Sequence, residues 1–148
     1  MASSENRPLL LDVNALLALA WPNHQFHTAV LARLEQRPVP RWATCALTQL
    51  GFVRLSSNPT IVEVRKTPAE AVDLLADLTR DQQHVYLETL PALPQTASVF
   101  RHLLGHQQVT DAYLLGVAEA NGATLLTFDR RVVASGSARA HIEVLKSG

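Results

Sequence analysis

Three aspartates stand at the edges of apolar segments, and their side chains are the ones in this chain best suited to chemistry. Asp12 follows a run of leucines, Asp111 opens a second apolar segment, and Asp129 follows Leu-Leu-Thr-Phe. Charged side chains are normally kept out of a hydrophobic core unless they are paired or bind a metal. If the fold brings the ends of these segments together, the carboxylates form an acidic pocket that requires a cation.

The electrostatic cost of such a pocket shows why a cation is expected. Two carboxylates about 4 Å apart repel each other by ~4 kcal/mol at an effective dielectric constant of roughly 20. Three such pairs would cost on the order of 12 kcal/mol, comparable to the roughly 5–15 kcal/mol that stabilises a domain. The cluster must take up protons or bind a cation, and carboxylate ligands favour Mg²⁺ or Mn²⁺. Such a metal activates water and holds a phosphate oxygen, which is phosphoryl-transfer chemistry.

Each aspartate taken alone also has a structural explanation. Asp12 can cap a helix, Asp111 can be a first-turn charge that the helix dipole tolerates, and Asp129 can begin a turn before Arg130 and Arg131. The functional interpretation therefore depends on the architecture that places the three side chains relative to one another.

Composition predicts one soluble, packed domain over residues 1–148, with 1–8 as a short N-terminal extension. Hydrophobic residues make up 47% of the 148 residues, and the formal net charge of zero gives no overall electrostatic support for nucleic-acid binding. Cys45 is the only cysteine, which excludes an intramolecular disulfide. Neither a signal peptide nor a membrane span is evident, so we expect a cytoplasmic protein and no membrane partner.

Short apolar runs alternate with helical patterns along the chain. Strands are predicted at 9–13, 41–45, 84–87, 123–128 and 141–145. Helices are predicted at 14–20, at 24–37, from Thr44 or Thr48 as cap through Leu55, from Pro68 within a Thr67–Glu70 capping box, at 96–105, and from a Thr110 cap to Asn121-Gly122. This alternation favours a parallel sheet covered by helices on both faces.

The predicted sheet gives the aspartates a common location. In open parallel sheets, sites form outside the carboxyl ends of the strands. Asp12 and Asp129 lie at two such ends, and Asp111 lies in the first turn of a helix. One shared pocket is therefore geometrically reasonable.

Four segments, in this order, carry a resemblance to a known family. They are Leu-Leu-Asp-Val-Asn at 10–14, Thr-Cys-Ala-Leu-Thr-Gln at 44–49, Val-Thr-Asp-Ala-Tyr-Leu at 109–114 and Leu-Thr-Phe-Asp-Arg at 126–130. The chain resembles a PIN domain, and specifically the VapC-type ribonuclease toxins of toxin–antitoxin pairs. No single segment is specific, but the ordered set covers nearly the whole chain, from about 9 to 145.

The resemblance implies a fold and an activity. The implied fold is a three-layer α/β/α sandwich with a five-stranded parallel sheet, and the implied activity is Mg²⁺- or Mn²⁺-dependent cleavage of RNA. Asp12, Asp111 and Asp129 fall on the catalytic and metal-binding positions, while Asn14 and Thr127 match polar residues that line the same pocket. A homodimer is also implied, together with a small VapB-like antitoxin that binds over the pocket.

Gln49 departs from the family pattern, because PIN domains usually carry a glutamate near this position. Its amide has an acceptor oxygen but no charge, so it bonds a metal-bound water yet holds a cation less well. Either the three aspartates suffice with Gln49 in a supporting role, or the protein is a catalytically weakened module that binds RNA or an antitoxin. Glu119 is a candidate fourth acid, although a solvated helix charge is the simpler explanation.

The remaining candidates have ordinary explanations beside functional ones. Arg54, Arg130 and Arg131 can hold RNA phosphates or can form surface ion pairs. His102 and His106 share a helical spacing typical of zinc ligands, but a third ligand is not evident, so a surface pair is the simpler interpretation. Phe52, Trp42 and Tyr113 are expected in the core.

A phosphatase of the haloacid dehalogenase type and a phospho-receiver also place an aspartate after the first strand. The phosphatase pattern requires a second aspartate where Asn14 stands, and both classes require a late lysine near the site. Lys146 is the only lysine after Asp111. The spacing therefore favours the nuclease over both alternatives.

Overall fold

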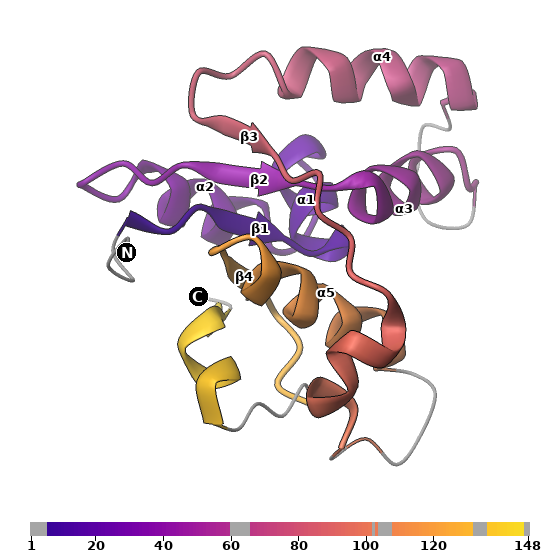
Figure 1. Ribbon diagram of the computed structural model, residues 1–148. Helices are drawn as coiled ribbons and strands as arrows, with labels where there is room; N and C mark the ends of the chain where they lie inside the picture. The colour runs from indigo at the N-terminus through magenta and orange to yellow at the C-terminus, as the bar shows by residue number, and fades with distance from the viewer. Residues whose placement is uncertain (1–5, 60–65, 102, 104–107, 132–135, 147–148) are drawn as a thin grey trace.

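Five parallel strands form a sheet in the order β3-β2-β1-β4-β5, with helices on both faces (Figure 1). The computed structural model describes residues 6–59, 66–101, 103, 108–131 and 136–146. The strands are β1 Leu9–Leu11, β2 Trp42–Thr44, β3 His84–Tyr86, β4 Thr124–Thr127 and β5 Ile142–Val144. Each lies within or overlaps a predicted strand, and the predicted parallel sheet is confirmed.

The helices fall into two layers. They are α1 Val13–Ala20, α2 His27–Glu35, α3 Ala46–Ser56, α4 Pro68–Leu78 and α5 Val109–Ala120, with the 3₁₀ segments Leu93–Phe100 and Gly136–His141. Helices α1 and α2 lie behind the sheet in Figure 1, and α5 lies on the opposite side. The three-layer α/β/α architecture is therefore confirmed.

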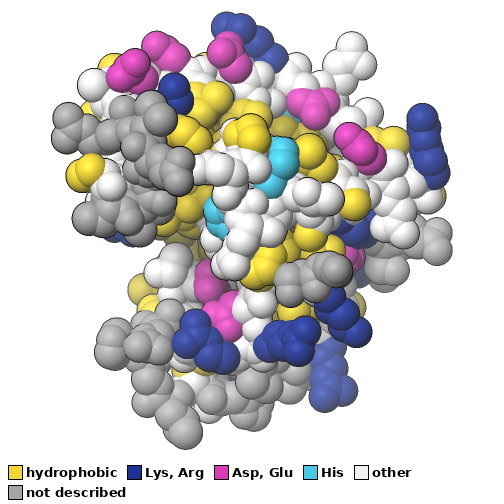
Figure 2. Space-filling model, turned by 180° about the vertical axis from the view of Figure 1, so that it is seen from behind, with side chains coloured by type: hydrophobic (Ala, Val, Ile, Leu, Met, Phe, Trp, Pro, Cys, Tyr) yellow, Lys and Arg dark blue, Asp and Glu magenta, His cyan; other side chains and the backbone are white. Residues whose placement is uncertain are grey.

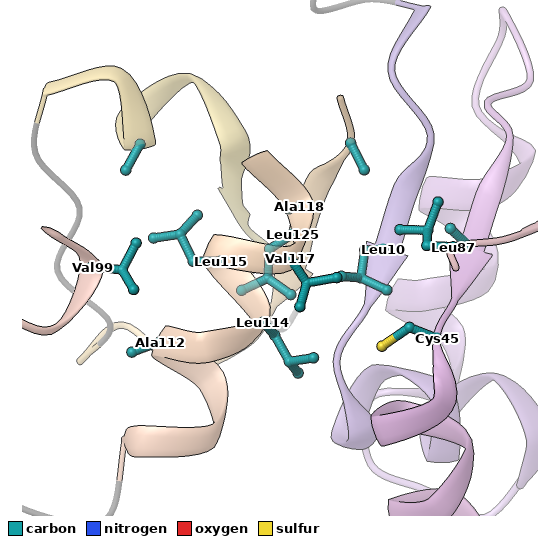
Figure 3. Close-up of a cluster of buried hydrophobic side chains, with 13 residues drawn as sticks. Leu10, Cys45, Leu87, Val99, Ala112, Leu114, Leu115, Val117, Ala118 and Leu125 are labelled. Atoms are coloured by element: carbon teal, nitrogen blue, oxygen red, sulfur yellow. The ribbon is translucent and has the colours of Figure 1, made fainter. Parts of the chain in front are cut away.

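The alternation of side chains along the strands explains the two layers. Leu10 and Leu125 point to one face, where they pack with Leu114 and Val117 of α5 (Figure 3). Their neighbours in the strands point to the opposite face and pack with α1, α2 and α3; these are Leu9, Leu11 and Leu126. Because both faces are buried, the strands are apolar without interruption.

Asp12 ends β1 two residues earlier than predicted. Its backbone N–H still bonds to the carbonyl of Leu126 at 3.1 Å, but its side chain accepts the N–H of Ala15 at 2.7 Å. This is an N-cap, so Val13 belongs to α1 and the strand over 9–13 was predicted too long.

One of the predicted helix start signals is correct and two are wrong. Thr67 and Glu70 form the predicted reciprocal capping box, with bonds of 2.9 and 3.1 Å. Cys45 is the N-cap of α3, and Thr48 accepts its N–H at 3.0 Å from inside the helix, so neither Thr44 nor Thr48 is the cap. Helix α5 begins before Thr110, which therefore does not cap it.

Two helices differ from their predicted extent. The helix predicted over 24–37 is shorter, because residues before His27 form turns. The helix predicted over 96–105 is a 3₁₀ segment, Leu93–Phe100, as far as it is described, and residues 102 and 104–107 lie outside the described part. The hydroxyl of Thr96 bonds the carbonyl of Leu93 at 2.8 Å, and Thr96 itself has non-helical dihedral angles.

The end of α5 agrees with the sequence. Gly122 follows the helix with a φ of 63°, the left-handed conformation that glycine adopts without strain. Across the described residues, every helix is too short or too polar to cross a membrane.

Candidate active site

The acidic side chains meet at the carboxyl ends of two neighbouring strands. Leu11 of β1 pairs with Leu126 of β4, so Asp12 and Asp129 follow strands that end side by side. The first turn of α5 adds Asp111. A pocket of about 510 Å³ is lined by Asp12, Val13, Asn14, Leu17, Phe26, Leu55, Asp111, Phe128, Asp129 and Arg131. Figure 2 shows acidic side chains in a recess of one face, with basic side chains beside them.

Asp12 is the most buried of the three aspartates, at 3% exposure. Its Oδ1 accepts the Ala15 N–H at 2.7 Å, and its Oδ2 accepts the Thr127 hydroxyl at 2.6 Å. Burial raises the pKa of Asp12 to about 6; the two hydrogen bonds oppose this, and the charges of Asp111 and Asp129 add to it. The Asp12 carboxylate therefore both caps α1 and lines the pocket.

Asp111 and Asp129 have opposite environments. Burial raises the pKa of Asp111, and the negative charge of Asp129 raises it further. The side chain of Arg131 holds the pKa of Asp129 below its usual range, because it donates from Nε at 2.9 Å and from Nη2 at 3.0 Å. The two aspartates that are not paired with an arginine thus carry raised pKa values.

The three carboxylates line the same pocket, but their oxygen atoms are not arranged as the ligands of a metal ion. Within the described ranges, no group of three or more Asp, Glu, His or Cys side chains is arranged so as to hold a metal ion. Asp12 is engaged by two hydrogen-bond donors and Asp129 by a guanidinium. The donor chemistry nevertheless fits a hard cation, since oxygen ligands and mutual repulsion are both present.

Thr127 connects two of the aspartates. Its hydroxyl donates to Asp12 and accepts the backbone N–H of Asp129 at 3.0 Å. Asn14 lines the pocket, and its Oδ1 lies 2.9 Å from Nε2 of His24. Two of the three residues predicted to support the site, Asn14 and Thr127, therefore touch it.

Gln49 is not among the residues that line the pocket. Its amide nitrogen donates to the Thr44 hydroxyl at 3.1 Å, and that hydroxyl lies 2.8 Å from Nε2 of His84. Glu119 lines a separate hollow beside Pro91. Neither residue reaches the three aspartates as a fourth ligand in this arrangement.

Of the three predicted RNA-binding arginines, only Arg131 lines the pocket. Its contact with Asp129 is the ion pair considered from the sequence. Arg54 and Arg130 are exposed and are not part of the lining. His102 and His106 lie outside the described residues.

The aromatic wall of the pocket was not predicted from the sequence. Phe26 and Phe128 line it, and their rings stack with centroids 4.1 Å apart. Phe128 directly precedes Asp129, which is a usable signal, whereas nothing in the segment around Phe26 indicates that it reaches the aspartates. Phe52 and Trp42 are buried as expected, at 0% and 2% exposure.

Comparison with known proteins gives the family. A profile of the PIN domain matches residues 9–135. Ribonuclease VapC39 of Mycobacterium tuberculosis (strain CDC 1551 / Oshkosh) is 39% identical over 130 residues, covering 87% of this chain and 94% of the relative. Ribonuclease VapC38 of strain H37Rv is 39% identical over 123 residues, covering 83% and 86%. Ribonuclease VapC44 is 36% identical over 140 residues, covering 92% and 98%. The chain belongs to the PIN domain family and is of the VapC type.

Proposed function

We propose that the protein is a Mg²⁺- or Mn²⁺-dependent endoribonuclease that hydrolyses RNA phosphodiesters. The observation that carries the proposal is the joint lining of one pocket by Asp12, Asp111 and Asp129, two of them with raised pKa values. The name ribonuclease, which the relatives described above share, supports the same substrate.

The three aspartates would hold the metal through their carboxylate oxygens. When bound, Mg²⁺ or Mn²⁺ supplies an activated water and neutralises charge on a phosphate oxygen. Thr127 keeps the Asp12 carboxylate in place by its 2.6 Å hydrogen bond. Arg131 presents a forked pair of donors at the pocket, which suits a phosphate as well as a carboxylate.

The test is RNA cleavage by the purified protein with Mn²⁺, with a chelator, and in the Asp12→Asn variant. We expect the chelator to abolish cleavage and the variant to lose roughly 100-fold or more, since even partners that only orient metal ligands are worth about 10–100-fold. Asp73→Asn, on the exposed face of α4, is the matched control and should retain full activity. Cleavage that survives both the chelator and the Asp12 change would exclude the mechanism.

The bonding of Gln49 to Thr44 favours one alternative, a catalytically weakened module that binds RNA or an antitoxin. In that case the purified protein would bind RNA but turn it over only as a Gln49→Glu variant. Metal-dependent turnover by the unchanged protein would rule this alternative out.

A small VapB-like antitoxin, a homodimer and a cytoplasmic location complete the proposal. An antitoxin that supplies an arginine would suit the carboxylates, because Arg131 already makes that kind of contact with Asp129. Co-expression with the product of a small upstream reading frame should give a complex that co-purifies and suppresses RNA cleavage. A protein that cleaves RNA equally well with that product bound would contradict the inhibitory pairing.

A further inference from the structure

Two phenylalanine rings form a wall of the acidic pocket. Phe128 lies between β4 and Asp129, and Phe26 immediately precedes α2. Their ring planes are inclined by only 17°, with centroids 4.1 Å apart. Both rings are half-buried, unlike the fully buried Phe52, and both line the pocket that holds the three aspartates. Each ring covers one face of the other, so the aromatic surface available within the pocket is the part of each ring that its partner leaves free.

His24 fixes this wall in place. Its Nδ1 accepts the backbone N–H of Phe26 at 3.1 Å, and its Nε2 lies 2.9 Å from Oδ1 of Asn14. Since Oδ1 can only accept, Nε2 carries the proton and the ring is neutral. Burial, reinforced by His27, lowers the pKa of His24, in agreement with that protonation state. The ring of His24 also lies 5.8 Å from that of Phe26, which extends the aromatic surface.

The chemistry of the pocket restricts what this wall can contact. Under the proposed function, the group that reaches Asp12 and Asp129 is a phosphate of RNA, and the group attached next to that phosphate is a nucleoside. Bases stack on aromatic side chains, and the interaction tolerates any base because each has a π-face. A base can stack in this way only if it has left a double helix.

We propose that Phe26 and Phe128 form a stacking surface for one unpaired nucleobase adjacent to the scissile phosphate, so that the substrate is single-stranded at that position. This rests on the proposed ribonuclease function. The aromatic wall recognises that a base is present but does not distinguish one base from another, because it does not contact the hydrogen-bonding edge. The amide NH₂ group of Asn14, whose oxygen faces His24, is placed to donate to the same nucleotide.

The first experiment removes bases from the RNA. A short single-stranded RNA that the protein cleaves is made with an abasic site at each position in turn, and kcat/KM is measured. Binding of the same series is measured by fluorescence anisotropy with the Asp111→Asn variant, which keeps the aromatic wall. One position should show a loss of about 5- to 100-fold in both measurements. A uniform effect at all positions would overturn the proposal.

The second experiment pairs the abasic RNA with protein variants. In whichever variant removes the ring beneath the base, Phe26→Leu or Phe128→Leu, the abasic site at the sensitive position should cost less than about 3-fold, because the stacking partner is already gone. Tyr86→Leu removes an exposed aromatic ring on β3 and should keep the full penalty. An unchanged penalty in both phenylalanine variants would refute stacking.

A fluorescent base keeps the proposal testable if those variants do not fold. 2-Aminopurine at the sensitive position should lose fluorescence on binding to the unchanged protein, and unaltered fluorescence would contradict stacking. Failure of the proposed ribonuclease function has a different signature: no RNA is cleaved with Mn²⁺, while the same abasic series made in a short single-stranded RNA that the protein binds still shows the position-specific binding penalty. If RNA is cleaved but no position shows a specific penalty, the stacking proposal is refuted and the ribonuclease function stands.

Discussion

Burial of the Asp12 carboxylate should make the metal-free protein less stable than its own Asp12→Asn variant at neutral pH. The folded-state pKa is about 6, against an ordinary value of 3.8. Each pKa unit corresponds to about 1.4 kcal/mol, so the ionised carboxylate costs on the order of 3 kcal/mol. An asparagine removes that cost and keeps an acceptor for the Ala15 N–H, but it no longer accepts the Thr127 hydroxyl, a loss of about 1 kcal/mol. The expected net gain is about 2 kcal/mol.

The pH dependence of this gain follows from the direction of the shift. Because the folded-state pKa lies above the unfolded-state value, the folded protein holds the proton of Asp12 more tightly. The stability of the unchanged protein relative to the variant is therefore greatest below about pH 4 and falls as the pH rises to about 6. Above about pH 7 the full cost is present, whereas at pH 4 the variant should be slightly the less stable of the two.

Thermal unfolding at pH 4, 5, 6, 7 and 8 checks the prediction. A gain of about 2 kcal/mol corresponds to a rise in Tm of roughly 4–8 °C at this chain length. Asp73→Asn, which removes an exposed carboxylate from α4, controls for the change of net charge. Added Mn²⁺ should stabilise the unchanged protein more than the Asp12 variant. A difference that is constant from pH 4 to pH 8, or a variant that is less stable at pH 8, would refute the reasoning.

Three further predictions concern the surroundings of the pocket. Thr127→Val should lower Mn²⁺ affinity, measured by calorimetry, by about 10–100-fold because Asp12 loses its orienting hydrogen bond, while Thr127→Ser should stay within a few-fold. Gln49→Glu should lower the Tm because a carboxylate cannot donate to Thr44, and an unchanged Tm would show that this contact is unimportant. Gly122→Ala should cost about 1–2 kcal/mol in urea unfolding because its φ is 63°, and Gly122→Asn should cost less.

The strands and the sheet were predictable because their signals are local and agree with one another. Short apolar runs separated by helical patterns leave few arrangements other than a parallel sheet. The errors arose where one side chain has two possible partners. Asp12 satisfies the N–H of Ala15 and so starts α1 early, and Thr96 bonds a carbonyl within its own segment, which disturbs the helix there. Such competition between side chain and backbone is decided by geometry that a pattern does not contain.

The acidic residues of the pocket were predictable, but their hydrogen-bond partners and the aromatic wall were not. Topology alone brings Asp12 and Asp129 to adjacent strand ends, as expected. The position of Phe26 depends on the turn after α1, where His24 bonds both the backbone of Phe26 and the side chain of Asn14. Contacts between residues of a turn and a distant strand leave no periodic signal, so sequence reasoning missed the aromatic wall.

The contact between Arg131 and Asp129 follows from the same electrostatics that led to the expectation of a metal. A cluster of carboxylates lowers its repulsion with any cation within reach, and a guanidinium two residues along the chain is always within reach. The sequence left two interpretations open for Arg131, ion pairing and phosphate binding. Both require the same property, a guanidinium that presents two donors to a pair of oxygen atoms. A rigid fork of donors that fits both oxygens of Asp129 fits two oxygens of a phosphate equally well. The ion pair places Arg131 at the pocket, and it is this placement that makes phosphate binding geometrically reasonable.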